Sequence, residues 1–232
     1  MKLLVSVRSA GEALAAAGAG ADFIDCKEPS AGALGALPLV TVQAVVEALR
    51  AARTGRPISA TVGDFAPGAL QAVLERAAAT AACGVDYVKV GIAPGDAALL
   101  DALAQCRFAV VPVFIADDGL DGALLERALA LPFAALMLDT ADKARGSLFD
   151  VLSEASLRGF VERVQSAGKL CGLSGALGTR HLPQLARLGS DFAGFRSAVC
   201  EGSRTGALDA ERVRRLRDDL RAATTPPLAR AL

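Results

Sequence analysis

Short hydrophobic segments alternate along the chain with longer segments in which apolar residues recur every three or four positions. Runs of about five residues rich in Val, Ile, Leu and Phe favour buried β-strands, whereas the longer Ala- and Leu-rich segments favour amphipathic helices. The pattern predicts eight strands, at residues 3–7, 22–26, 58–62, 86–90, 109–115, 134–138, 169–173 and 191–195. It predicts helices at residues 10–17, 39–53, 70–82, 96–106, 122–130, 148–167, 182–188 and 209–222.

This alternation predicts an α/β fold in which each strand is followed by a helix. Several predicted helices end at a glycine that leads into the next strand, such as Gly84 and Gly168, which is common in short helix-to-strand loops. Eight such units in 232 residues average 29 residues each. We therefore predict a single-domain (β/α)8 TIM barrel over residues 1–223 and an irregular tail at 224–232. An open doubly wound sheet is less compatible, because the first predicted turn, VSVRSAGEA, lacks a G-x-G-x-x-G motif.

Composition and charge exclude several classes of protein. The 25 basic and 25 acidic side chains cancel, and the chain has one Tyr and no Trp, so nucleic-acid binding is not expected. The longest apolar stretches, residues 13–21 and 108–116, are about half as long as the roughly 20 residues that span a bilayer, so no membrane partner is expected. Ser6 and Arg8 interrupt the apolar start, which argues against a signal peptide. We expect a cytoplasmic protein.

The cysteines and the lone histidine give no evidence for a cofactor. The five cysteines are scattered and include no C-x-x-C pair, so neither a disulfide framework nor a zinc site is expected. We interpret them as small buried residues. His181, the only histidine, is interpreted as structural. The sequence therefore predicts no metal and no cofactor. The Ala-rich outer helices could pack between subunits of a homo-oligomer, but a compact monomeric barrel would use them equally well.

In a (β/α)8 barrel, polar residues at the carboxyl ends of the strands are the candidates for chemistry. The chain has five Lys and 20 Arg, yet three of the lysines, Lys27, Lys89 and Lys143, fall at or just beyond these ends. A lysine amine can lose its proton and attack a carbonyl group, whereas a guanidinium stays protonated. This placement favours imine or proton-transfer chemistry. Phosphate binding, or structural ion pairs with Asp25 and Asp139, is the alternative.

The spacing of the acidic residues adds detail to this hypothesis. Asp25 and Lys27 are two residues apart in an extended segment, so they project to the same side, where the carboxylate could hold the amine and carry protons. A second ammonium nearby, from Lys89 or Lys143, would lower the pKa of Lys27. Asp139 and Lys143 are four residues apart and would pair if their loop begins as a helical turn.

Two glycine-rich loops are candidates for phosphate binding. The segments GLSGALGTRH and GFRSAVCEGSRTG follow the seventh and eighth predicted strands, the positions at which many barrels bind phosphate. The candidate residues are Gly172, Ser174, Gly175, Arg196, Ser197, Gly202 and Arg204. Glycine-rich turns also occur without ligands, so this motif is only moderately specific.

Taken together, these segments resemble one family over residues 3–217. The segments are LLVSVRSAGEALAAAGAGADFIDCKEPSAGALGA, ISATVGDF, GVDYVKVGI, DTADK at 139–143, CGLSGAL and GFRSAVC. They resemble the (5-formylfuran-3-yl)methyl phosphate synthases, also called 4-(hydroxymethyl)-2-furancarboxaldehyde-phosphate synthases, of methanofuran biosynthesis. The most specific element is D-x-K-x-P followed by G-x-L-G-A, which comprises Asp25, Lys27, Pro29, Gly32, Leu34, Gly35 and Ala36. Cys26 and Glu28, which flank the lysine, depart from the family's pattern.

The resemblance implies a TIM-barrel lyase that joins two molecules of glyceraldehyde 3-phosphate, loses phosphate and water, and closes a furan ring. It implies that Lys27 is the Schiff-base lysine and Lys89 the proton acceptor, with Asp25, Asp139 and Lys143 as further charged residues of the active site. Two alternatives stay open. One is a class I Schiff-base aldolase that acts on triose phosphates, and the other is a non-catalytic sugar-phosphate-binding barrel.

Overall fold

Eight parallel strands close into a barrel in a computed structural model that describes residues 1–66, 68–142 and 145–224. Each strand pairs with its sequence neighbours, and β1 pairs with β8 to close the ring. The strands are β1 (Lys2–Val7), β2 (Phe23–Cys26), β3 (Ile58–Thr61), β4 (Tyr87–Ile92), β5 (Val110–Ile115), β6 (Ala135–Asp139), β7 (Leu170–Leu173) and β8 (Phe192–Phe195). The predicted (β/α)8 barrel is confirmed, and each strand lies within two residues of its predicted bounds.

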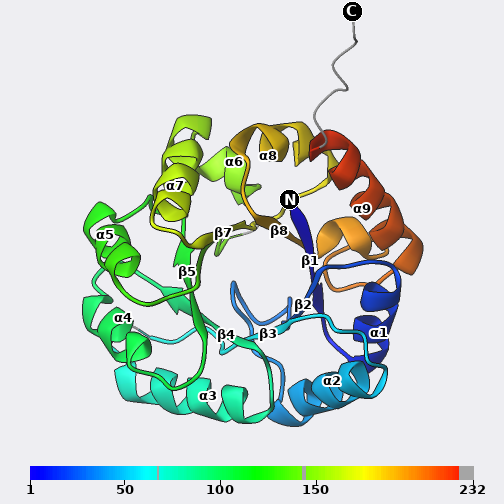
Figure 1. Ribbon diagram of the computed structural model, residues 1–232, viewed down its shortest axis with the longest axis horizontal. Helices are drawn as coiled ribbons and strands as arrows, with labels where there is room; N and C mark the ends of the chain where they lie inside the picture. Colours follow the sequence, from blue (N-terminus) through cyan, green and yellow to red (C-terminus); the bar gives the residue numbers. More distant parts are fainter. Residues whose placement is uncertain (67, 143–144, 225–232) are drawn as a thin grey trace, which may run out of the picture.

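The helices form an outer ring around the strands (Figure 1). They are α1 (Ala10–Gly18), α2 (Leu39–Ala51), α3 (Leu70–Ala82), α4 (Ala97–Ala104), α5 (Gly122–Ala130), α6 (Leu148–Val151), α7 (Glu154–Ser166), α8 (Leu182–Leu188) and α9 (Ala210–Thr224), with short 3-10 helices at Thr179–His181 and Ser197–Val199. The final helix thus continues to the first residue of the predicted tail. The rest of that tail, residues 225–232, lies outside the described residues.

One predicted helix is wrong, because residues 148–167 form two helices, α6 and α7. The backbone of Leu152 is extended, which ends α6. The Ser153 side chain then accepts a hydrogen bond from the Ser156 N–H and caps the start of α7. Serine competes in this way for backbone donors and favours a helix start over a helix interior. The apolar periodicity runs across this break and therefore did not reveal it.

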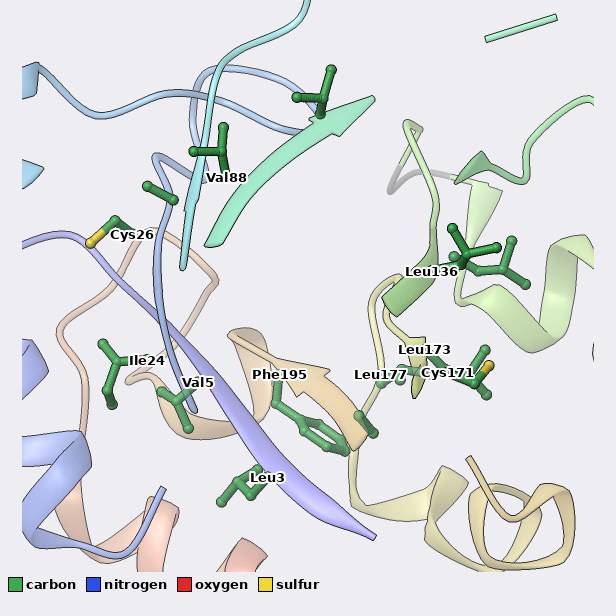
Figure 2. Close-up of a cluster of buried hydrophobic side chains, with 14 of the residues drawn as sticks. Leu3, Val5, Ile24, Cys26, Val88, Leu136, Cys171, Leu173, Leu177 and Phe195 are labelled. Atoms are coloured by element: carbon green, nitrogen blue, oxygen red, sulfur yellow. The ribbon is translucent and has the colours of Figure 1, made fainter. Parts of the chain in front are cut away.

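The main hydrophobic core lies between the barrel and the helices, and Figure 2 shows part of it. Outward-facing strand residues such as Leu3, Val5 and Ile24 are fully buried there. A second, smaller cluster fills the barrel interior and includes Leu4, Met137 and Phe192. Because both faces of each strand are buried, the strands read as continuous apolar runs. Polar side chains within these runs are therefore exceptional, and they mark the candidate functional site described below.

Candidate active site

Four charged side chains from three strands are buried inside the barrel near its carboxyl end. Asp25 lies in β2, Lys27 directly follows β2, Lys89 lies in β4 and Asp139 ends β6. The exposed fraction of these four residues lies between 1% and 8%. The Lys27 N–H donates to the Val7 carbonyl, which extends the β1–β2 ladder by one residue and fixes the backbone of the lysine. Two of the three lysines expected at the strand ends are thus placed together, while Lys143 lies outside the described residues.

The two lysines pair with acids on other strands. The distance from Lys27 Nζ to Asp139 Oδ2 is 2.9 Å, and the distance from Lys89 Nζ to Asp25 Oδ2 is 3.1 Å. The expected contact between Asp25 and Lys27 is replaced by this crossed arrangement. Residues two apart on a strand share a face but are separated by about 6.6 Å along the strand, whereas alternate strands contribute side chains to the same layer of a barrel. Each lysine therefore pairs with the acid that lies in the same layer of the barrel: Lys27 with Asp139 and Lys89 with Asp25.

Hydrogen bonds satisfy the remaining oxygen atoms of both acids. The Thr140 N–H donates to Asp139 Oδ1 over 2.8 Å. Ser59 Oγ donates to Asp25 Oδ1 over 2.6 Å, and Ser6 Oγ donates to Asp25 Oδ2 over 3.2 Å. Burying ionised groups is costly, and such additional hydrogen bonds are needed to offset the lost hydration. The barrel therefore holds two ion pairs in which every carboxylate oxygen accepts a hydrogen bond.

A cavity borders both pairs and gives a ligand access to both lysines. The cavity is lined by Leu4, Ser6, Asp25, Lys27, Pro29, Lys89, Met137, Asp139, Ser174, Gly175, Ala176, Leu177, Gly194, Phe195, Arg196, Ser197 and Arg204. All four described members of the predicted catalytic set thus face one cavity, together with the loops that follow β7 and β8. An amine, carboxylates and hydroxyl groups around one cavity suit carbonyl addition and proton transfer.

The predicted phosphate-binding residues divide into two groups. Ser174, Gly175, Ser197 and Arg204 line the cavity, as does Arg196. Gly175 has a φ of 118°, and a Cβ there would lie 3.0 Å from the Thr140 side chain, so the bend after β7 requires glycine. Gly172 and Gly202 do not line the cavity.

The Arg196 guanidinium is occupied by the protein itself. It donates two hydrogen bonds to the Glu12 carboxylate and others to the carbonyl groups of Ser6, Arg204 and Gly206. All five of its N–H donors are thereby used. Arg196 therefore ties the loop after β8 to β1 and α1, and it is not free to bind a phosphate group directly.

A family model for 4-HFC-P synthase matches residues 3–217 of this chain. The chain belongs to the 4-HFC-P synthase family. It is 41% identical over 224 residues to a Methylorubrum extorquens protein that is named as a provisional (5-formylfuran-3-yl)methyl phosphate synthase. This match covers 95% of this chain and 92% of the relative. It is 36% identical to the (5-formylfuran-3-yl)methyl phosphate synthase of Methanopyrus kandleri, covering 94% of this chain and 98% of that relative. The resemblance expected from the sequence is confirmed.

Solved structures match the barrel of this 4-HFC-P synthase family member. Phosphoribosyl anthranilate isomerase from Thermotoga maritima superposes with a TM-score of 0.69, covering 96% of this chain and 99% of that structure, at 15% identity. The 3-hexulose-6-phosphate synthase of Salmonella typhimurium gives a TM-score of 0.64, covering 96% and 100%, at 17% identity. At this level of identity the likeness establishes the shared barrel fold and nothing about activity.

The family motif G-x-L-G-A after Lys27 has a structural explanation in the loop between β2 and α2. Leu34 is 1% exposed and packs into the barrel interior beside Gly91, where a Cβ would lie 2.8 Å from the leucine. Asp64 accepts a hydrogen bond from the Leu34 N–H, and a Cβ on Gly32 would collide with the same carboxylate. Gly35 leaves room for the Glu28 carbonyl. The motif therefore closes the loop tightly beside Lys27.

The two unusual neighbours of Lys27 do not join the site. Burial, with a smaller contribution from the charge of Asp25, raises the pKa of the Cys26 thiol far above its usual range, so this side chain is not a nucleophile. The Glu28 carboxylate accepts hydrogen bonds from the backbone and hydroxyl of Ser30. Neither residue therefore competes with Asp139 for the Lys27 amine.

The other cysteines and His181 are accounted for by the fold. All five cysteines are free. Cys26, Cys171 and Cys200 are buried as expected, but Cys83 and Cys106 are only partly buried, so the interpretation as buried residues is wrong for these two. The His181 ring accepts a hydrogen bond from the Gly178 N–H and lies against Phe149. In the described part of the chain, no group of three or more His, Cys, Asp or Glu side chains could hold a metal ion. Across the same residues, no helix is both long and apolar enough to cross a bilayer.

Sequence reasoning missed two residues that hold the site together, Glu12 and Ser59. Ser59 interrupts the apolar run of β3 at a position that faces the barrel interior, and this hydroxyl was the available signal. Glu12 gave no such signal, because it lies in the first turn of α1, where an acidic residue is ordinary.

Gly172→Ala tests whether this predicted phosphate ligand has a packing role instead. A Cβ at position 172 would lie 2.2 Å from the buried Phe192 ring, so we expect the free energy of unfolding to fall by about 1–3 kcal/mol. Gly178→Ala is the matched control, because its Cβ would meet nothing within 4 Å. Chemical denaturation measures both variants. Unchanged stability in Gly172→Ala would contradict this packing role.

Glu12→Gln tests the ion pair between Glu12 and Arg196 through the pH dependence of protein stability. Burial of Glu12 favours its neutral form, but hydrogen bonds from Arg196 and the Arg8 backbone outweigh this effect and lower its pKa. Because the pKa of Glu12 is lower in the folded than in the unfolded state, ionised Glu12 stabilises the fold at pH values above its unfolded-state pKa. This contribution is lost as the pH falls through the folded-state pKa. We expect Glu12→Gln to be less stable at pH 7 but to lose less stability in acid. Denaturation between pH 7 and 3 measures this difference. Equal loss of stability in acid for the wild type and Glu12→Gln would contradict a stabilising Glu12–Arg196 ion pair.

Proposed function

We propose that this chain is a (5-formylfuran-3-yl)methyl phosphate synthase of methanofuran-type cofactor biosynthesis that acts through an imine on Lys27. The observation that carries the proposal is the crossed arrangement of two buried lysines and two carboxylates around one cavity. It fits a reaction that needs one amine to bind a carbonyl group and another to move a proton. Family membership and the activity named for its relatives support the same reaction.

The proposed substrate is glyceraldehyde 3-phosphate, and the atoms balance without an oxidant or reductant. Two triose phosphates contain together the atoms of one (5-formylfuran-3-yl)methyl phosphate, one orthophosphate and two waters. Lys27 first transfers a proton to Asp139, which lies 2.9 Å away, and its neutral amine attacks the aldehyde of one triose. Loss of water gives an iminium ion. That positive charge makes the neighbouring carbon acidic.

Lys89 is the proposed base for the next step. Its neutral amine removes the proton from that carbon, giving an enamine and an ammonium group that the Asp25 carboxylate stabilises. The enamine carbon then attacks the aldehyde carbon of the second triose and forms the new carbon–carbon bond. Elimination of phosphate from the second triose, addition of water at the carbon that the phosphate leaves, ring closure on the iminium carbon with release of the Lys27 amine, and loss of two hydroxyl groups as water follow. Asp25, Asp139 and Lys143 are the proposed proton carriers of these steps.

The loops after β7 and β8 are the proposed site for the retained phosphate group. Ser174, Gly175, Ser197 and Arg204 line the cavity there and offer hydroxyl, backbone and guanidinium donors. Arg204 also donates a hydrogen bond over 3.3 Å to the carbonyl of Gly32, which links this loop to the one after Lys27. We assign Arg196 a positioning role in this loop, because its donors are already used.

Borohydride reduction in the presence of glyceraldehyde 3-phosphate tests the imine. Reduction should fix one triose phosphate on the peptide that contains Lys27, and peptide mass analysis should locate it there. A protein without an adduct would favour the non-catalytic sugar-phosphate-binding barrel. An adduct on Lys89 alone would exchange the roles of the two lysines. A class I aldolase would also form the Lys27 adduct, so its exclusion requires analysis of the product.

A further inference from the structure

Two serine hydroxyls hold the Asp25 carboxylate at the base of the cavity. Asp25 Oδ1 accepts a hydrogen bond of 2.6 Å from Ser59, while Oδ2 accepts one of 3.2 Å from Ser6 and one of 3.1 Å from Lys89 Nζ. The strand register brings them together, because Ser6 and Ser59 are the direct partners of Asp25 on β1 and β3. All three are less than 10% exposed. The carboxylate is thus fixed from both neighbouring strands.

The position of these hydroxyls keeps the two ion pairs separate. Asp25 and Lys27 lie on the same face of the same strand, so a carboxylate free to change its rotamer could compete with Asp139 for the Lys27 ammonium. Hydrogen bonds to both oxygens of Asp25 fix its plane and direct Oδ2 towards Lys89. Among the described residues, Lys27 is then left to pair with Asp139. Separate counterions let one lysine act as the nucleophile and the other as the base.

We propose that Ser59, assisted by Ser6, is a positioning residue that keeps the Asp25 carboxylate directed at Lys89 throughout the proton transfer. The proposal rests on the proposed function, in which Lys89 is neutral before it removes the substrate proton. In that state Asp25 has lost its cation, and the hydroxyls then supply its remaining stabilisation as a buried anion. When Lys89 accepts the proton, the ammonium group forms directly beside an aligned carboxylate. The proton thus moves from carbon to Lys89 and not to Asp25.

The other titratable groups near Asp25 are few in the described residues. Lys27 lies one layer above Asp25, directly after β2. Lys89 and Tyr87 face the interior from β4. Asp139 faces it from β6, and Arg196 follows β8. Lys27 is paired with Asp139, and Arg196 is paired with Glu12. Lys89 is therefore the cation in direct contact with Asp25. A change in the hydrogen bonds of Asp25 should therefore act mainly on its contact with Lys89.

Ser59→Ala tests the proposal through the pH profile of turnover. Ser59→Ala removes a hydrogen bond that stabilises the Asp25 carboxylate, so the acidic limb of kcat against pH should move to higher pH. We expect kcat at neutral pH to fall about 10- to 100-fold with little change in KM, since a hydrogen bond to a charged group is lost. Ser59→Thr keeps the hydroxyl and should restore the wild-type profile. Thr61→Val is the matched control, because it removes a buried β3 hydroxyl that donates to the Cys26 and Gly35 carbonyls and not to Asp25.

The outcomes separate this inference from the proposed function. Borohydride trapping on Lys27 should persist in Ser59→Ala, because the Lys27–Asp139 pair is untouched. Failure of the wild type to form an adduct would overturn the proposed function. An adduct in both proteins, together with an unmoved acidic limb or the same shift in Thr61→Val, would overturn the role of Ser59. If Ser59→Ala does not fold, Ser6→Ala should give a smaller shift in the same direction, and an unmoved profile there would also overturn the proposal.

Discussion

Lys27→Arg is expected to abolish turnover of glyceraldehyde 3-phosphate while leaving the barrel folded. A guanidinium can keep the ion pair with Asp139, but it does not lose its proton and so forms no imine. We expect kcat to fall by about 1,000-fold or more, since the covalent intermediate is lost. Product formation, borohydride trapping and thermal unfolding together measure the effect.

Lys2→Arg is the matched control for this change, because Lys2 is exposed at the start of β1, at the opposite end of the barrel from the cavity. Its turnover should equal that of the wild type. Retained turnover in Lys27→Arg would mean that a positive charge suffices at this position, and the imine would have to be abandoned.

Lys89→Gln is expected to give the second largest effect and to separate imine formation from proton abstraction. The Gln amide can still donate a hydrogen bond to Asp25 but cannot act as a base. We expect kcat to fall by about 100- to 10,000-fold, the usual contribution of a positioned general base. Trapping of the triose on Lys27 should continue.

Hydrogen exchange at the substrate carbon next to the aldehyde gives the most direct measure of this step. In deuterated water the wild-type enzyme should incorporate deuterium at this carbon, and Lys89→Gln should do so far more slowly. Exchange at the wild-type rate in Lys89→Gln would assign the base to another residue.

The sequence predicted the barrel well, because the pattern that forms it is local. Apolar runs separated by amphipathic segments follow from burial on both faces of each strand, and all eight strands lie where this pattern placed them. The break between α6 and α7 was missed, since a single serine cap decided it against a continuous apolar stripe. Side-chain capping competes with periodicity at the scale of a few residues.

The site was predictable in its members but not in its contacts. The scarcity of lysine singled out Lys27 and Lys89, and the fold brings them to one cavity. The partner of Lys27 lies 112 residues away, and only the arrangement of alternate strands determines that pairing. Arg196 matched the expectation for a phosphate ligand by its position in the chain. Its donors are nevertheless used within the protein by Glu12 and loop carbonyls, which no local pattern reveals.

Quantitative analysis of the products formed from glyceraldehyde 3-phosphate alone tests the proposed reaction most directly. The wild-type enzyme should release one orthophosphate for every two trioses consumed and form one product with the composition C6H7O6P, which absorbs in the near ultraviolet as a furan aldehyde. Both the mass and the phosphate ratio follow from the balanced reaction. A six-carbon sugar bisphosphate formed without release of phosphate would instead identify an aldolase and contradict the proposed synthase.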